Sequence, residues 1–196
     1  MKEIIFATKN KGKIKEIQNI LGKSFIIKSM EEINIDIDIV EDGKTFEENA
    51  IKKACEIMKI TNKIVLADDS GLEIDCLNGE PGVYSARYLG EDTPYDIKNA
   101  KILDKLKEVK EDKRGARFVS VIALAMPNKE PVTTKGTVEG VIGYEIKGQN
   151  GFGYDPIFYI PELNKMMAEL SLEEKNKISH RGKALKQMKK ILEEMM

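Results

Sequence analysis

The sequence has few cysteines, and this scarcity limits the kinds of site that it can build. Cys55 and Cys76 are the only two, and they do not form a CxxC pair. The spacing therefore favours neither a structural zinc site nor a disulfide framework. We expect both residues to be reduced, buried thiols of a cytoplasmic protein.

The chain also lacks an excess of either charge and lacks a long apolar run. Lys and Arg number 32 against 33 for Asp and Glu, so no overall basic field exists to bind a nucleic acid polymer or an anionic membrane. A phosphate ligand would need a local cluster of positive groups. No segment approaches the roughly 20 apolar residues of a membrane span. The first residues, "MKEIIFATKN", turn polar too early for a secretory signal peptide, which again indicates the cytoplasm.

What the chain does contain is an alternation of predicted strands and helices. The 196 residues are enough for one domain or for two lobes that share a core. This order predicts an α/β fold with a mixed sheet and helices on both faces, and a later β-pair could build a second lobe. Ligands of such sheets bind beyond the carboxyl ends of strands. Strands are predicted at 2–8, 24–30, 63–67, 116–127, 131–143 and 156–160, helices at 13–22, 45–60, 95–109 and from about 179, and a half-exposed strand or extended loop at 33–40.

The segment "TKNKGK", Thr8–Lys13, lies between the first strand and the first helix. The N-terminus of a helix offers unpaired N–H groups and the positive end of its dipole, which together favour an anion. Thr8 and Asn10 can donate hydrogen bonds, and Lys13 adds a full positive charge. The segment is not a P-loop, because the first glycine of that motif is missing and Ile14, in place of Ser or Thr, follows the lysine. The alternative is an ordinary strand–helix turn with solvated lysines.

Asp68 and Asp69 stand side by side where the apolar run "IVLA" ends. Adjacent carboxylates raise each other's pKa unless a cation compensates them. In an extended chain the two side chains point in opposite directions, so one can hold a metal while the other orients water or backbone. Glu41 could supply a further oxygen ligand for Mg²⁺. The alternative is a turn, which Asp, Ser and Gly also favour.

Two later segments contain candidate ligand contacts. In "NGFGYDPIF", residues 150–158, glycines would let the backbone approach a flat ligand, and Phe152 could stack on a base. A tight turn before a strand is the alternative. In "LSLEEKNKISHRGKA", Ser171 and Glu174 predict a capping box. His180, the only histidine, opens the last helix and could read a base or phosphate, or could simply be a surface or packed residue.

Taken together, five stretches resemble the inosine triphosphate pyrophosphatase family, whose members remove non-standard purine nucleotides such as dITP and XTP. They occur in family order over nearly the whole chain, and the overall look is that of bacterial members. The stretches are "FATKNKGK", "VEDGKTFEENA", "LADDSGLEIDCLNGEPGVYSARY", "GFGYDPIF" and "MAELSLEEKNKISHRGKAL".

The resemblance implies a fold, a reaction and a set of site residues. The fold would be a single domain, residues 1–196, with an elongated, twisted mixed sheet and two lobes around a central cleft. The chain would form a homodimer and would use Mg²⁺ to convert a nucleoside triphosphate to the monophosphate and pyrophosphate. Asp69 looks like the general base and a metal ligand, Glu41 like a second metal ligand, and Asp68 is a further candidate ligand. The implied substrate contacts are Thr8, Lys9, Asn10, Lys11, Gly12, Lys13 and Ser70 for the phosphates, Lys13 being catalytic too, and Phe152, Gly153, Tyr154, Asp155, Lys175, His180 and Arg181 for the base and sugar.

The implied reaction is consistent with physical chemistry, but alternative functions remain open. Attack on a triphosphate requires its negative charges to be neutralised, and a nearby carboxylate can take the proton of the attacking water. Hydrogen-bond donors facing the 6-position of the purine ring would favour hypoxanthine and xanthine, which carry an oxygen acceptor there, over adenine, which carries an amino group. The rivals are a nucleotide phosphatase, a pyrophosphatase of other nucleotides, and a non-catalytic nucleotide sensor. A sensor would have no reason to keep Asp69, Glu41 and Lys13 together.

Overall fold

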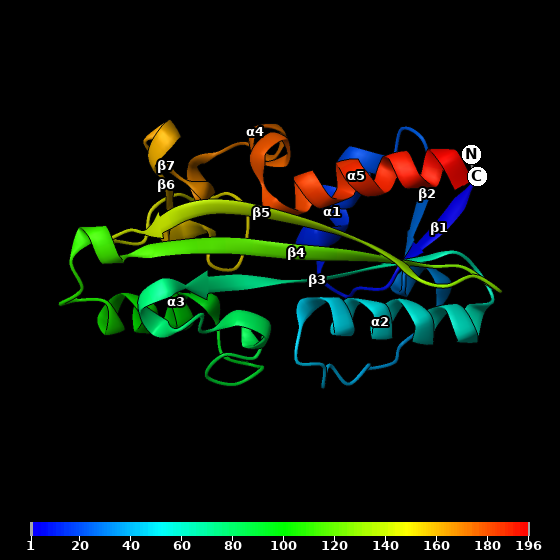
Figure 1. Ribbon diagram of the computed structural model, residues 1–196, viewed down its shortest axis with the longest axis horizontal. Coiled ribbons are helices and arrows are strands. Elements are labelled where there is room, and N and C mark those ends of the chain that lie inside the picture. Colours follow the sequence, from blue (N-terminus) through cyan, green and yellow to red (C-terminus); the bar gives the residue numbers. More distant parts are fainter. Residues whose placement is uncertain (1, 196) are drawn as a thin grey trace. The chain divides into compact units, whose positions relative to one another are not determined.

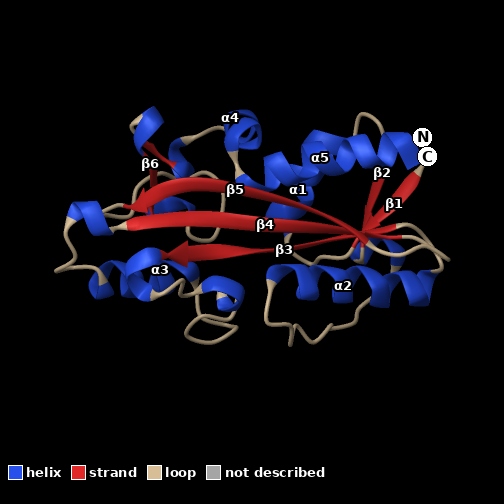
Figure 2. Cartoon of the chain, viewed as in Figure 1, coloured by secondary structure: helices blue, strands red, loops and turns tan. Residues whose placement is uncertain are grey.

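The computed structural model describes residues 2–195, which form five α-helices and one seven-stranded sheet (Figures 1 and 2). The strand order is β2-β1-β3-β4-β5-β6-β7. Strand β1 pairs in parallel with β2 and β3, whereas β6 pairs antiparallel with β5 and β7, so the predicted mixed α/β sheet is confirmed. The strands are β1 Glu3–Phe6, β2 Ile26–Ser29, β3 Val65–Ile74, β4 Gly115–Ala125, β5 Val132–Ile142, β6 Phe158–Ile160 and β7 Lys165–Met166; the helices are α1 Lys11–Leu21, α2 Phe46–Thr61, α3 Tyr95–Lys105, α4 Leu172–Ile178 and α5 His180–Met195.

Three details differ from the sequence prediction or decide between its alternatives. Residues 35–43 form an extended loop and not a strand. Strand β7 was not predicted, because two residues carry no periodicity to detect. The third difference concerns β3, which continues through the Asp pair. Cys55 and Cys76 are both free thiols, as predicted, but their expected burial is wrong. Cys55 is only half-buried because it lies outside the buried face of α2, and Cys76 is exposed.

Side chains next to the helix starts explain why α1, α2 and α4 begin where they do. The Asn10 and Thr45 side chains accept hydrogen bonds from the N–H groups of Lys13 and Glu48. Ser171 and Glu174 form the predicted capping box. At Thr45 a capping box is only half formed, because the Glu48 carboxylate accepts from the N–H of Lys44 and not from that of Thr45.

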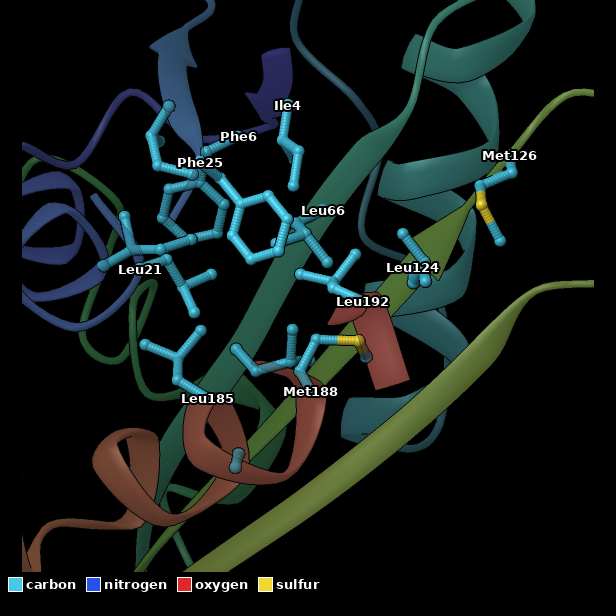
Figure 3. Packing of buried hydrophobic residues seen from close by; sticks show 14 residues of the cluster. Ile4, Phe6, Leu21, Phe25, Leu66, Leu124, Met126, Leu185, Met188 and Leu192 are labelled. Atoms are coloured by element: carbon cyan, nitrogen blue, oxygen red, sulfur yellow. The ribbon is translucent and has the colours of Figure 1, made fainter. Parts of the chain in front are cut away.

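The chain divides into two compact units, each with its own apolar core. The first contains residues up to Asp69, residues Ser120–Gly136 and residues from His180 onward. In it, α1 and α5 cover one face of the sheet, and α2 lies on the other face (Figure 1). The core on the α1–α5 side is shown in Figure 3. Its buried members are Ile4, Phe6, Ile17, Leu21, Phe25, Ile27, Leu66, Ile122, Leu124, Met126, Ala184, Leu185, Met188 and Leu192.

The second unit contains Ser70–Val119 and Thr137–Ser179. Its core joins α3 to β3, β4, β5 and β6 through residues that include Ile74, Ile102, Phe118 and Phe158. The elongated shape, the single-domain organisation and the central cleft stay predictions. Among residues 2–195 no helix is both long and apolar enough to cross a membrane.

A glycine allows helix α5 to approach strand β5 within the first unit. A Cβ atom on Gly136 would collide with the carbonyl oxygen of His180, and would also lie 2.7 Å from the backbone nitrogen of Ala184. Nearby, the Thr134 hydroxyl donates to the carbonyl oxygen of Ala184 at 2.9 Å. The first turns of α5 therefore lie directly against the β5 backbone, and this contact fixes the backbone position from which the Arg181 side chain extends.

Candidate active site

Strand β3 runs from Val65 to Ile74 and so includes Asp68 and Asp69 in its interior. The expectation that the strand ends at the Asp pair is therefore wrong, and so is the alternative of a turn there. Because side chains alternate along a strand, Leu66 and Asp68 face α1 and α5, whereas Asp69 faces α2. The prediction that the two carboxylates point in different directions is confirmed by their different partners.

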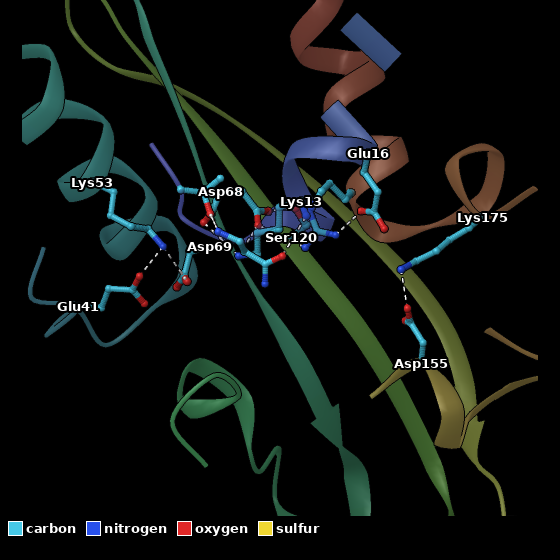
Figure 4. Close-up of polar contacts among 12 residues, drawn as sticks. Lys13, Glu16, Glu41, Lys53, Asp68, Asp69, Ser120, Asp155 and Lys175 are labelled. Carbon is cyan, nitrogen blue, oxygen red and sulfur yellow. Dashed lines mark hydrogen bonds and ion pairs between the residues drawn. The ribbon is translucent and has the colours of Figure 1, made fainter. Parts of the chain in front are cut away.

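Asp68 is fully buried and receives cations from two helices (Figure 4). Its Oδ2 lies 2.6 Å from the Lys13 Nζ of α1 and 3.3 Å from the Arg181 guanidinium of α5. Its Oδ1 accepts a 2.6 Å hydrogen bond from the Ser120 hydroxyl. Arg181 also donates to the buried carboxylate of Glu16, so a continuous polar chain joins α1, α5 and the sheet.

Asp69 lies among partners from α2 and from the loop that precedes it. Its Oδ2 accepts from the Asn49 side-chain amide at 3.1 Å, and its Oδ1 lies 3.2 Å from the Lys53 Nζ. The same Lys53 Nζ lies 2.7 Å from Glu41 Oε1. Asn49 also accepts from the N–H of Gly43 at 2.8 Å, which ties the loop of Glu41 to the helix. Asp69 and Glu41 thus converge on one position, which the Lys53 ammonium holds.

The two neighbouring carboxylates have opposite pKa shifts. Burial alone would raise the pKa of Asp68, but the charges of Arg181 and Lys13 outweigh it and hold this pKa well below its usual range. Burial raises the pKa of Asp69, and the attraction of Lys53 does not fully offset it. Burial opposes the charged form of Lys53 as well, yet Asp69 and Glu41 together raise its pKa. Asp69 is therefore the more basic of the pair, which suits a group that accepts a proton.

The sequence analysis missed Lys53, Asn49, Ser120 and Glu16. A signal for the first two was present on α2, where the buried face contains Phe46, Ala50, Ala54 and Ile57. Asn49 and Lys53 fall on that face at helical spacing, and a polar residue on a buried face requires a partner. Glu16 gives a similar signal, because it stands next to Ile17 on the buried side of α1.

The segment Thr8–Lys13 forms the predicted junction of β1 and α1, and its side chains have several different partners. Asn10 is the N-cap of α1, and the Thr8 hydroxyl accepts from the Asn10 N–H at 3.1 Å. Lys9 is exposed and pairs with Asp36 and Asp38 in the loop at 2.8 and 2.7 Å, which raises the pKa of Lys9 to about 12. Lys11 is exposed and Gly12 is half-buried in the first turn. Only Lys13 of this segment pairs with Asp68 in the described contacts.

The second unit holds the loop with Phe152, Gly153, Tyr154 and Asp155 in a network of its own. The buried Asp155 carboxylate pairs with the Lys175 Nζ at 2.6 Å (Figure 4). The Tyr154 hydroxyl donates to the Ser85 carbonyl oxygen at 2.7 Å. The structure therefore brings Phe152, Asp155 and Lys175 together, and their role in a base and sugar pocket stays a prediction.

The remaining candidate residues are distributed over the two units. Ser70 follows Asp69 in β3 and is half-buried. His180 is the first residue of α5 and is buried, so the alternative of a surface residue is wrong. Arg181 was predicted to contact base or sugar; the structure shows its guanidinium on Glu16 and Asp68 within the first unit.

The donor set at Asp69 suits a hard cation that also binds the substrate. Among residues 2–195 no three His, Cys, Asp or Glu side chains are grouped closely enough to hold a metal by themselves. Mg²⁺, however, usually takes only one or two carboxylates and completes its shell with water and phosphate oxygens. Glu41 and Asp69 fit this pattern, because their oxygens already converge on a single cation.

Known proteins of one family are similar to this chain over nearly its whole length. The sequence model of the Ham1 family matches residues 4–191. The dITP/XTP pyrophosphatase of Bacillus subtilis is 51% identical over 194 residues, which cover 98% of each chain. The solved structure of the Ham1 protein of Staphylococcus aureus is 46% identical, with a TM-score of 0.87 over 99% of this chain and 100% of the other. A Ham1 protein of Coxiella burnetii is 43% identical, with a TM-score of 0.89 over the same shares.

Proposed function

This chain belongs to the Ham1 family, and we propose that it hydrolyses non-standard purine nucleoside triphosphates, such as dITP and XTP, to the monophosphate and pyrophosphate. The names of the similar curated proteins support the reaction and the substrate class. The observation that carries the proposal within this structure is the convergence of Asp69 and Glu41 on one cation, Lys53. A nucleoside triphosphate with its metal is the kind of ligand that such a site can bind.

Asp69 is the proposed general base. Its pKa is raised by burial, and the Asn49 amide fixes the orientation of its carboxylate. It would take a proton from the water that attacks the α-phosphorus, in line with the departing bridge oxygen. Asp68 is already engaged by Lys13, Arg181 and Ser120, so we assign it to holding Lys13 in place and not to metal binding.

The phosphates would be held by positive groups of the first unit. Lys13 and Lys53 are cations on either side of β3, and the N-terminus of α1 adds unpaired N–H groups. Thr8, Lys9 and Ser70 are further proposed phosphate contacts. Mg²⁺, bound by Glu41, Asp69 and the substrate, would neutralise charge on the phosphates and on the leaving pyrophosphate.

The proposal includes three properties that rest on the family resemblance. The base and sugar would be bound by the loop of Phe152 to Asp155. The chain would act as a homodimer, which sedimentation equilibrium can test. It would work in the cytoplasm, where nucleotide pools are kept, and fractionation of cells that express a tagged chain can test this.

Identification of the products tests the reaction directly. The protein is incubated with ITP and Mg²⁺ in ¹⁸O-labelled water, and the first-turnover products are separated. We expect IMP and pyrophosphate, with the label in IMP, because water attacks the α-phosphorus. Label in pyrophosphate would place the attack at the β-phosphorus and contradict the proposed step. Early release of IDP and single phosphates would favour a nucleotide phosphatase.

A panel of triphosphates tests the substrate class and the remaining rivals. We expect ITP, dITP and XTP to be hydrolysed with a higher kcat/KM than ATP, GTP or pyrimidine triphosphates. Faster hydrolysis of pyrimidine nucleotides would identify a different pyrophosphatase. Binding without turnover at any metal concentration would identify a nucleotide sensor.

A further inference from the structure

The backbone of Phe152 is held by a carboxylate that comes from the same loop. Asp155 Oδ2 accepts a 2.9 Å hydrogen bond from the N–H of Phe152. The same oxygen lies 2.6 Å from the Lys175 Nζ of helix α4. Each of the two charged side chains is only 3% exposed. The pair is therefore a buried ion pair that connects the loop to α4.

The ring of Phe152 is held by the other partner of this pair. The Lys175 Nζ lies over the ring, 4.7 Å from its centroid. A cation at this distance is attracted to the face of an aromatic ring. Phe152 itself is half-buried. One ion pair thus contacts the residue at two points, its backbone N–H and one face of its ring, and fixes the direction in which the ring points.

The glycine before Phe152 makes this arrangement possible. Gly151 has a φ of +74°, and a Cβ atom there would collide with the Asp155 carboxylate. Any other residue at this position would be strained and would push the carboxylate away from the loop. The loop sequence is therefore suited to bringing a buried carboxylate against the backbone of Phe152.

We infer that Asp155 and Lys175 are positioning residues, which hold the Phe152 ring as a stacking platform for the purine base and act through that ring. This inference rests on the proposed function and deepens its base pocket. Replacing a buried ion pair by apolar residues often costs little stability, so a role in fixing one geometry accounts for the pair better than stability does. Lys175 occupies one face of the ring, and the base would stack on the opposite face.

The experiment compares a substrate that has a base with one that has none. We would measure kcat and KM for ITP and for inorganic tripolyphosphate in the wild type, Lys175→Met and the control Lys177→Met, an exposed lysine of the same helix. We expect Lys175→Met to lower the ratio of kcat/KM for ITP over tripolyphosphate by about tenfold, the order of one base–aromatic stacking contact, through a higher KM for ITP. Lys177→Met should leave the ratio unchanged.

A double-mutant cycle with Phe152→Ala shows whether Lys175 acts through the ring. In that background Lys175→Met should lower the ratio no further. An equal loss in both backgrounds would overturn the inference, because Lys175 would then contact the base itself. An unchanged ratio in Lys175→Met alone would overturn it too. If this variant does not fold, Asp155→Asn/Lys175→Met removes both buried charges and takes its place in the same cycle.

Failure of the proposed function gives a different result. A wild-type protein that hydrolyses tripolyphosphate as efficiently as ITP would show that no base is recognised, whatever the variants do. A wild type that prefers ITP, combined with an unaltered Lys175→Met ratio, would reject only the positioning role.

Discussion

The two faces of strand β3 place the adjacent carboxylates of Asp68 and Asp69 in opposite electrostatic environments. On the face toward α1 and α5, Asp68 receives two cations and a hydroxyl, and its pKa is held low. On the face toward α2, Asp69 shares the Lys53 ammonium with Glu41, and its pKa is raised. The first arrangement is a structural ion-pair network, and the second leaves a basic carboxylate. Two adjacent residues of the same type thus have opposite pKa shifts, because the helices that they face supply different charged partners.

The comparison predicts that changing Asp69 affects activity most. Asp69→Asn is nearly isosteric, but it removes the proposed base and one negative charge from the proposed metal site. We expect kcat for ITP to fall by about 10²-fold or more, the usual contribution of general base catalysis. Circular dichroism should show an unchanged fold. The control is Asp42→Asn, which removes an exposed carboxylate of the neighbouring loop and should keep activity. Activity near the wild-type level in Asp69→Asn would remove Asp69 from the mechanism.

Changing Asp68 should mainly affect stability. Asp68→Asn leaves the buried Arg181 and Lys13 with less compensating charge, so we expect the free energy of unfolding to fall by about 3 kcal/mol. Urea unfolding followed by circular dichroism measures the loss. Asp69→Asn should cost clearly less, because burial already disfavours the charge of Asp69. Equal losses in the two variants would mean that the two faces do not differ as described.

Glu41→Gln tests the proposed metal site on the α2 face of β3. The proposed metal site would lose one of its two carboxylates, and Lys53 would lose one partner. We expect the Mg²⁺ concentration for half-maximal activity to rise by about tenfold, a typical cost of weakening a metal site. Titration of activity with Mg²⁺ measures this shift, again with Asp42→Asn as the control. An unchanged Mg²⁺ requirement would place the metal elsewhere.

The smallest effect concerns pH and the capping box of α4, the helix that carries Lys175. The N–H of Ser171 holds the pKa of Glu174 below its ordinary value of 4.5. A lowered pKa stabilises the folded state at pH values above the ordinary pKa, and this contribution is lost as the pH falls through the folded pKa. The thermal midpoint of the wild type should thus slightly exceed that of Glu174→Gln at pH 7, and the gap should close as the pH falls through the folded-state pKa of Glu174. A gap that is constant with pH would show that the charge of Glu174 does not matter.

The sequence predicted those features that depend on short range patterns. The apolar face of α5, the capping box at Ser171 and the mixed sheet all follow from spacing within a few turns or strands. Asn10 was expected to donate hydrogen bonds, whereas its side chain accepts one from the Lys13 N–H as the N-cap of α1. The opposite directions of Asp68 and Asp69 follow from strand geometry alone.

The features that the sequence could not show depend on distant partners. "DDSG" resembles a turn, and β3 continues through it because Lys13 and Arg181 compensate Asp68 from positions 55 and 113 residues away. No local pattern reveals such partners. The family resemblance supplied the proposed roles of Asp69 and Glu41, but the ammonium of Lys53 between them became visible only in the structure.

Gly136 has no functional group, yet the place of Arg181 depends on it. Its missing side chain lets the first turns of α5 lie on the β5 backbone, and from there Arg181 reaches Glu16 and Asp68. Even a methyl group at position 136 would shift the start of α5, and the effect would pass through Asp68 to Lys13. Gly136 is in this sense a spacer: the side chain that it lacks sets the position of an ion-pair network that it does not itself contact.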